Sequence, residues 1–473
     1  MKNKILFLFA FVALIGLASC NNAKSVQPGD AHFKFTIQGM PNMRLVFIPT
    51  NPFDSIRDTV MTDANGTAIF TKHLDKGTYF EVSLGEQVRF PLFLLPGDTT
   101  FMDATVQDFF GTQQFSGQTS LYNNYLADYT KSSNKFQKAI YQIFSRPEDV
   151  AVKAIDSVRN EHKKVLDDFL KTNSDADAEF VRIEKARILY EWALLRNVYP
   201  LYFRYLNKID SFEMSPEYMS YLGAVDVNDS ALLDLPIYQS YLDSYLGSKV
   251  EPYYKSDALQ AEYKSPIVYR LKMIDELFDN KAIKQVLAFK SVMNFIRYDG
   301  IKDYDLYFDK FKEICTYPYY QRIVDEMLAE WQHLKKGMPS YNFTFVDMDG
   351  NQVSMSDFKG KYVYVDVWAT WCNPCRKEIP YLKKMEEEFH GKNIVFVSIS
   401  VDQTQDPWRA MVQEDSLKGV QLWAGQAREF SKFYKISGIP RFMLFDKEGN
   451  IIEASATRPS GGVDKQIAAL PGL

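Results

Sequence analysis

The stretch Trp371-Cys372-Asn373-Pro374-Cys375 decides the fold of the C-terminal part of this chain. It holds two of the four cysteines, and it directly follows the apolar β-type run Val363–Trp368. The pattern from Arg376 to His390 is helical, so the two thiols lie on a turn between a strand and a helix. Unpaired N–H groups and the dipole at a helix N-terminus favour thiolate over thiol. The spacing therefore predicts a dithiol that forms and opens a small disulfide, as thiol–disulfide exchange requires.

The N-terminus predicts export. Lys2 and Lys4 precede the apolar run Ile5–Leu17, which is too short to span a bilayer comfortably and fits a signal peptide over residues 1–19. The ending Leu17-Ala18-Ser19-Cys20 resembles a bacterial lipobox, and this resemblance implies cleavage before Cys20 and lipid attachment to its sulfur. The alternative is a conventional signal with an incidental cysteine, although the usual Ala-x-Ala ending is absent. Polar residues then predict a tether over residues 20–30, with the acyl chains holding the protein at a membrane.

The remaining cysteines and the histidines argue against two other uses of the pair. Half of a zinc site would need a second Cys or His pair, but Cys315 stands alone and the five histidines show no ligand spacing. A static disulfide over so small a loop would stabilise little. The sequence therefore predicts no metal site and no cofactor. We expect Cys315 to be a buried small hydrophobic residue rather than a third redox thiol.

Length and charge bound the architecture. The 473 residues allow about three domains, and 46% apolar residues supply ample material for a core. The net charge of −5 comes without a basic block, so no nucleic-acid partner is expected.

Residues 31–117 alternate between short β-type runs and turn residues, which predicts a small β-sandwich or barrel-like N-terminal domain. The expected strands are Phe33–Ile37, Arg44–Ile48, Thr67–Phe70 and Tyr79–Ser83.

Residues 118–336 change to a helical period, which predicts a central all-α domain. Expected helix starts follow Pro147, Ser174, Ser215 and Ser265. The many Tyr and Phe residues of this region favour helix–helix packing, and a groove for a ligand or a client protein is the alternative.

Residues 337–473 alternate strands with helices, which predicts an α/β layer fold with the reactive turn at the C-terminal end of a strand. The expected strands are Asn342–Val346, Tyr362–Trp368, Ile394–Val401, Gln421–Ala424, Arg441–Phe445 and Ile451–Ala454. The expected helices are Cys372–His390, Asp406–Glu414 and Ala427–Tyr434.

A set of motifs in this last region resembles the TlpA/ResA group of membrane-tethered thiol–disulfide oxidoreductases, which have a thioredoxin fold. The motifs are Asp349-Gly350, Asp357-Phe358-Lys359-Gly360-Lys361, Val367-Trp368-Ala369-Thr370-Trp371-Cys372-x-Pro374-Cys375, Lys377-Glu378-Ile379-Pro380, Gly438-Ile439-Pro440 and Asp446-x-x-Gly449. The β-region resembles, more weakly, the domain found ahead of such modules in Bacteroidetes lipoproteins. The helical region resembles no family that we can name.

The resemblance and the chemistry assign roles to four residues of the site. Cys372 is the expected nucleophile, the more exposed sulfur with a lowered pKa, and Cys375 is the resolving thiol. The resemblance implies that Pro440 is a cis-proline facing the cysteines. Ile439 would then offer backbone hydrogen bonds to an extended client segment.

Two acidic residues are candidates for moving protons. Asp366 lies on an otherwise apolar strand, where a buried carboxylate has a raised pKa and can take the proton of Cys375. Thioredoxins carry an Asp at the matching place, and related tethered reductases carry a Glu at the place of Glu378. A surface or capping carboxylate is the alternative for each. We expect the run Glu386–Glu388 to lie on the solvated face of the helix.

The flanking tryptophans have two interpretations. Trp371 either flanks a client groove or packs in the core, and Trp368 packs behind the reactive turn or in the core.

We therefore expect a lipid-anchored thiol–disulfide oxidoreductase in the cell envelope, facing the periplasm. Its partners would be client proteins with disulfides, which it reduces, and a membrane thiol reductase that supplies electrons. The alternatives are a disulfide oxidase or isomerase, and a binding lipoprotein in which the thioredoxin domain is accessory. A peroxidase is disfavoured because Trp371-Cys372 replaces the Thr-x-x-Cys of peroxiredoxins.

Overall fold

A computed structural model describes residues 27–473, apart from 55, 86–87 and 210. The chain divides into two compact units, up to residue 188 and from residue 189, and the division falls within helix α5 (Ala178–Asn207). The boundaries of the three expected domains stay a prediction. Among the described residues, no helix is both long enough and apolar enough to cross a membrane.

The first unit contains two four-stranded sheets, ordered β4-β1-β7-β8 and β3-β2-β5-β6 in the part that is described. Alternate residues of β1 point into the core, where Phe33 packs against Phe47 of β2 with ring centroids 6.2 Å apart. The β-rich prediction is confirmed, although β3, β6, β7 and β8 have no counterpart among the expected strands. The strands are β1 (Gly29–Gln38), β2 (Arg44–Pro49), β3 (Asp58–Met61), β4 (Thr67–Leu74), β5 (Thr78–Leu84), β6 (Val88–Leu94), β7 (Thr99–Thr105) and β8 (Gln114–Gly117).

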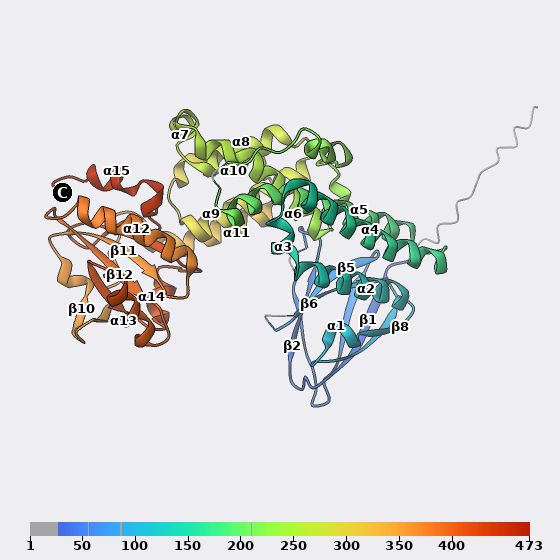
Figure 1. The fold of residues 1–473 in the computed structure, drawn as a ribbon. Coiled ribbons are helices and arrows are strands. Elements are labelled where there is room, and N and C mark those ends of the chain that lie inside the picture. Colours follow the sequence, from blue (N-terminus) through green and yellow to red (C-terminus); the bar gives the residue numbers. More distant parts are fainter. Residues whose placement is uncertain (1–26, 55, 86–87, 210) are drawn as a thin grey trace, which may run out of the picture. The chain divides into compact units, whose positions relative to one another are not determined.

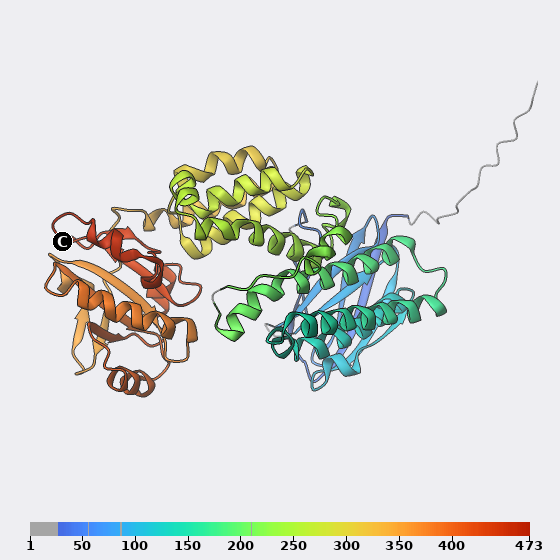
Figure 2. The same ribbon diagram turned by 45° about the horizontal axis from the view of Figure 1, so that its top comes forward.

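Helices follow the strands in this unit, and α2 packs along β6 and β8 with α4 against it (Figure 2). Pro147 caps α4, with Glu148 and Asp149 in the first turn, as the sequence predicts. Asp177, the last residue of the expected start Ser174-Asp175-Ala176-Asp177, caps α5: its side chain accepts a hydrogen bond from the N–H of Phe180 at 2.8 Å. The helices are α1 (Phe109–Thr112), α2 (Ser120–Gln137), α3 (Ile140–Phe144) and α4 (Glu148–Thr172).

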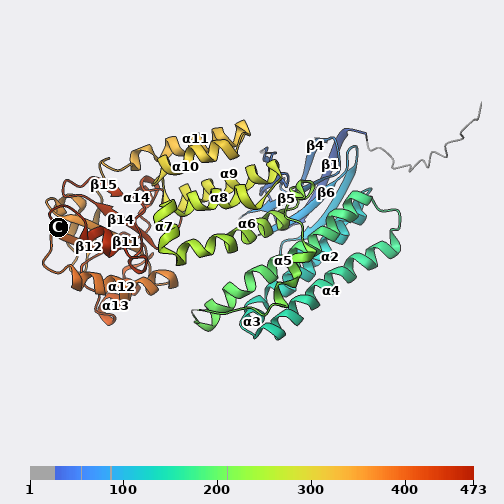
Figure 3. The same cartoon turned by 90° about the horizontal axis from the view of Figure 1, so that it is seen from above.

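The second unit begins with helices that pack side by side (Figure 3). The expected start at Ser265 is confirmed, but after Ser215 only a 3-10 helix forms, Tyr218–Ala224. Tyrosines are buried between the helices, as helix–helix packing requires; Tyr320, for example, stacks on Phe289 with centroids 4.0 Å apart. These helices are α6 (Pro236–Val250), α7 (Asp257–Tyr263), α8 (Pro266–Leu277), α9 (Lys281–Asp299), α10 (Tyr304–Ile314) and α11 (Pro318–Trp331).

The C-terminal part is a seven-stranded sheet in the order β10-β9-β13-β12-β11-β14-β15. Its central strand, β11, pairs parallel with β12 and antiparallel with β14, and all its residues are buried. α12 and α15 cover one face (Figure 1), and α14 packs its Phe430 against Phe343 and Phe345. The elements are β9 (Thr344–Asp347), β10 (Gln352–Ser354), β11 (Tyr362–Trp368), α12 (Asn373–Glu388), β12 (Ile394–Ser400), α13 (Gln405–Glu414), β13 (Val420–Trp423), α14 (Arg428–Phe433), β14 (Arg441–Phe445), β15 (Ile451–Glu453) and α15 (Val463–Ala468).

Candidate active site

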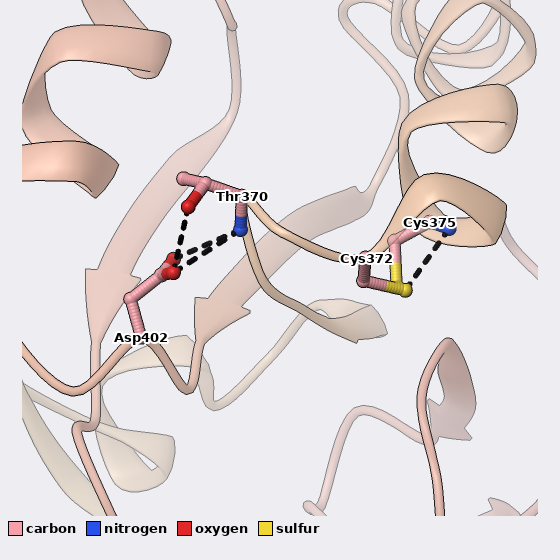
Figure 4. The surroundings of a disulfide bond; sticks show 4 residues. All are labelled: Thr370, Cys372, Cys375 and Asp402. Carbon is pink, nitrogen blue, oxygen red and sulfur yellow. Dashed lines mark hydrogen bonds between the residues drawn. A yellow bond between two sulfur atoms is a disulfide. The ribbon is translucent and has the colours of Figure 1, made fainter.

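The reactive turn joins β11 to α12, and a disulfide links Cys372 to Cys375 across it (Figure 4). Cys372 caps the helix, and its Sγ accepts a hydrogen bond from the backbone N–H of Cys375 at 3.2 Å. Pro374 lies in the first turn, where its missing N–H costs no helical hydrogen bond. Sγ of Cys372 therefore lies at the positive end of the helix dipole.

A buried carboxylate, Asp402, holds the other side of the turn (Figure 4). It accepts hydrogen bonds from the Thr370 N–H, at 3.0 and 3.3 Å from its two oxygens, and from the Thr370 hydroxyl at 2.8 Å. The hydroxyl of Ser400, at the end of β12, lies 2.8 Å from the same carboxylate. The chain between β11 and the cysteines is therefore fastened to the neighbouring strand.

The two cysteines differ little in exposure. Cys372 is 4% exposed and Cys375 3%, so both are almost fully buried in the disulfide form, and the greater exposure of the Cys372 sulfur stays a prediction. Both residues pack into a small apolar cluster with Trp368, Ala369 and Trp408.

The flanking tryptophans have different surroundings. Trp368 is buried and packs with the cysteines, behind the reactive turn as one interpretation predicts. Trp371 is 69% exposed, so it is not a core residue.

The loop that precedes β14 carries the expected proline. The Ile439–Pro440 peptide bond is cis, as the resemblance implies. Ile439 packs on the cluster that contains the cysteines, and it also lines an open hollow of about 530 Å³ together with Trp371 and Arg428. The hollow therefore lies beside the reactive turn.

Asp366 lies on β11, beside Ser398 of β12, and is buried as predicted. The Ser398 hydroxyl donates to its Oδ1 at 2.5 Å. Burial raises the pKa of Asp366 to about 7; the Ser398 hydrogen bond lowers it in part, and the nearby Glu386 raises it further. A carboxyl group that titrates near neutral pH is suited to accept and return a proton.

Glu378 is also buried, on the first half of α12. Its carboxylate accepts hydrogen bonds from the N–H of Ser460 at 3.0 Å and from the Ser460 hydroxyl at 2.9 Å. Ser460 lies in the 3-10 helix Pro459–Gly461, just before α15. Glu378 is therefore not a surface carboxylate, and it holds the first turn of this 3-10 helix.

One cavity of about 20 Å³ connects these groups, with room for about one water molecule. Asp366, Cys375, Glu378 and Pro440 all line it, so four of the expected site residues lie around one space. Glu386 lines it too and is partly buried, so the expectation that Glu386 lies on the solvated face of the helix is wrong. Packing of α12 on the sheet turns this residue inward.

Two residues of the site are missed by the sequence reasoning. Asp402 comes two residues after β12, at the edge where parallel strands present functional side chains, and that position is the signal for it. Glu386 lies on the same helix face as Cys375, because 11 residues make about three turns.

Two expected residues lie elsewhere. Cys315 is fully buried, its thiol is in no disulfide, and burial raises its pKa to about 11, as expected for a packing residue. Cys20 lies outside the described residues. Within the described chain, no group of three or more His, Cys, Asp or Glu side chains is placed to hold a metal ion.

A Cys-x-x-Cys disulfide at the N-terminus of a helix, on the central strand of such a sheet and beside a cis-proline, defines a thioredoxin-fold thiol–disulfide exchange protein. The Redoxin family profile matches residues 335–468.

Comparison with known proteins gives the family. The chain is 30% identical over 122 residues to thiol-disulfide oxidoreductase ResA of Bacillus thuringiensis subsp. konkukian, covering 26% of this chain and 70% of that protein. It is 26% identical over 140 residues to ResA of Bacillus subtilis, covering 30% and 76%. A solved structure of a putative thiol-disulfide oxidoreductase from Bacteroides vulgatus is 51% identical, covers 28% of this chain and 88% of that one, and has a TM-score of 0.26. The protein belongs to the ResA-like thiol–disulfide oxidoreductases, and it is an enzyme of that class.

Proposed function

We propose that the protein reduces disulfide bonds of client proteins in the cell envelope, with Cys372 as the attacking thiol and Cys375 as the resolving thiol. The observation that carries this proposal is the position of Cys372 Sγ at the cap of α12, where it accepts the Cys375 N–H. That hydrogen bond and the helix dipole both stabilise a thiolate, which is the reacting species.

The chemistry takes two exchanges. The Cys372 thiolate attacks a client disulfide, forms a mixed disulfide and expels one client sulfur as a thiolate, which takes up a proton. Cys375 then loses its proton, attacks Cys372 and expels the second client sulfur, which is protonated in turn. The enzyme ends with the Cys372–Cys375 disulfide, and the client gains two electrons and two protons.

The hollow beside the turn supports a protein client. Ile439, just before the cis-proline, would pair its backbone with an extended client segment, in the manner of an added strand. The exposed indole of Trp371 would cover the client from the other side.

The location and the electron source belong to the same proposal. A signal peptide over residues 1–19 and lipid on Cys20 would tether the enzyme to a bacterial membrane, facing the periplasm. A membrane thiol reductase would then return electrons to the Cys372–Cys375 disulfide after each turnover.

Insulin reduction by the full chain tests the proposal, with dithiothreitol as the electron source. We expect the wild type to precipitate insulin, Cys372→Ser to lose the activity, and the matched control Cys315→Ser to keep it. Cys375→Ser should leave clients disulfide-linked to Cys372 in cells. A wild type without reductase activity, or a couple as oxidising as about −120 mV, would contradict the proposal and favour an oxidase or a binding protein.

A further inference from the structure

Glu386 is an acidic residue of α12 that the mechanism above does not use. It lies on the helix face that carries Cys375 and Glu378, and with both of them it lines the cavity beside Asp366. The Glu386 carboxylate lies close to Gly419. A Cβ at Gly419 would come within 2.7 Å of Glu386 Oε1, so the glycine leaves room for the carboxylate.

Two buried polar atoms belong to residues that line the cavity. The indole N–H of Trp368 and Oε1 of Gln421 are buried and have no hydrogen-bond partner within the described chain, and both residues line the cavity. A donor and an acceptor beside the Asp366 carboxyl give a single water molecule the partners it needs.

Two lysines line the cavity as well. Lys383 of α12 and Lys418, which precedes β13, line it, and both favour the ionised form of Glu386. Lys418 also lies 3.4 Å from Glu387 on the surface. Glu386 therefore stands between the buried Asp366 and the solvent.

We propose that Glu386 is the last proton acceptor of a path that carries the proton of Cys375 from Asp366 through the cavity to solvent. This inference rests on the proposed function, because the proton concerned is released in the resolving step.

Cys375 gives its thiol proton to Asp366, its sulfur bonds to Cys372, and the bond from Cys372 to the client breaks with the electron pair on the client sulfur. Asp366 passes the proton through the cavity to Glu386, and Glu386 loses it to solvent. The client thiolate takes a proton from solvent.

Charges around the pair fit this coupling. Burial raises the pKa of Glu386 to about 7, with Lys418 and Lys383 lowering it and Glu387 raising it. Among the causes that raise the pKa of Asp366 is the charge of Glu386. On the same face of the sheet, Tyr364 has a raised pKa, through burial first and then the charges of Asp366 and Glu378. The negative charge of Glu386 therefore favours the protonated form of Asp366.

The test compares Glu386→Gln with the matched control Glu388→Gln. Glu388 is an exposed glutamate two residues further along α12, on the other side of the helix. The measured quantity is the pH profile of the resolving step, from a preformed mixed disulfide on the full chain. We expect Glu386→Gln to move the acidic limb to lower pH by about half a unit or more, because the negative charge that raises the pKa of Asp366 is gone. Glu386→Asp should restore the profile, and an unchanged profile in Glu386→Gln would overturn the inference.

A second readout needs no activity. Carboxyl infrared or NMR titration of Asp366 in the oxidised protein should show the same downward shift in Glu386→Gln and none in Glu388→Gln. If the wild type is active but the pKa of Asp366 is the same in Glu386→Gln, only the proton path is refuted. If the pKa of Asp366 shifts in Glu386→Gln but the wild type has no reductase activity, the coupling is supported and the proposed function is refuted.

Discussion

Asp366 carries an ionisable group into the middle of a sheet. Its strand neighbours are apolar and buried, and the Ser398 hydroxyl is its hydrogen-bond donor. A charge there is stabilised less than in water, so the folded protein holds the proton up to a pH of about 7. The unfolded chain releases it near its ordinary value of 3.8. Asp366 therefore costs nothing in acid and destabilises the fold increasingly as the pH rises from about 4 to about 7.

The first prediction concerns Asp366→Asn, which keeps an acceptor for Ser398 and removes the charge. We expect it to raise the free energy of unfolding of the oxidised protein by about 2–4 kcal/mol at about pH 8, and by less than about 1 kcal/mol at about pH 4. Guanidinium unfolding followed by tryptophan fluorescence measures this, since Trp368, Trp371, Trp408 and Trp423 all lie in the C-terminal region. Asp406→Asn, at an exposed site, is the control, and a gain that does not depend on pH would contradict the argument.

The sequence identifies residues whose chemistry follows from spacing, and it misses residues whose role follows from packing. Cys372 and Cys375 are marked by their spacing, and Asp366 by being the acid in an apolar strand. Glu386 belongs to an acidic run that resembles any solvated helix surface, and only the packing of α12 on the sheet distinguishes it from Glu388.

At the scale of elements, β11 and α12 flank the reactive turn. The ranges Tyr362–Trp368 and Arg441–Phe445 are predicted with the bounds that the structure has, because long apolar β-type runs mark buried strands. The short strand β10 and the last helix α15 are missed. Three or six residues carry too little pattern, and pairing with neighbours decides their conformation.

The second prediction concerns the fastening of the turn. Asp402→Ala removes the acceptor for the Thr370 N–H and hydroxyl and leaves them unpaired. We expect a loss of about 1–3 kcal/mol in the stability of the C-terminal region and faster hydrogen exchange in the peptide that spans the turn. Exchange followed by mass spectrometry measures this, with Asp406→Ala as the control. Equal exchange in both variants would show that Asp402 does not hold the turn.

At the scale of the whole molecule, the redox chemistry is confined to one end of the chain. The cysteines are at positions 20, 315, 372 and 375, so the β-sandwich has none. Its core is rich in phenylalanine. The change from β to helical to alternating patterns is readable from the sequence. The boundary between the two compact units falls inside α5 and cannot be read from the sequence, because the residues within a helix carry no local signal of a domain boundary.

The third prediction counts reactive thiols in the reduced full chain carrying Cys20→Ser. Cys315 is fully buried with its pKa raised to about 11, so it should stay unmodified by iodoacetamide at neutral pH while Cys372 reacts. All three thiols should react in guanidinium. Peptide mass spectrometry assigns the sites. Modification of Cys315 in the native protein as fast as that of Cys372 would mean that its cover opens readily.

The small space around Cys375 also determines how the rate of the resolving step depends on the buffer. Cys375 lines a cavity with room for about one water molecule, together with Asp366 and Glu378, so phosphate, imidazole or another buffer base does not fit beside it there. Proton removal is then an internal event, so the resolving rate at a fixed pH should not rise with buffer concentration, whereas it should fall in heavy water. The resolving rate of such an enzyme depends on pH and not on the concentration of buffer.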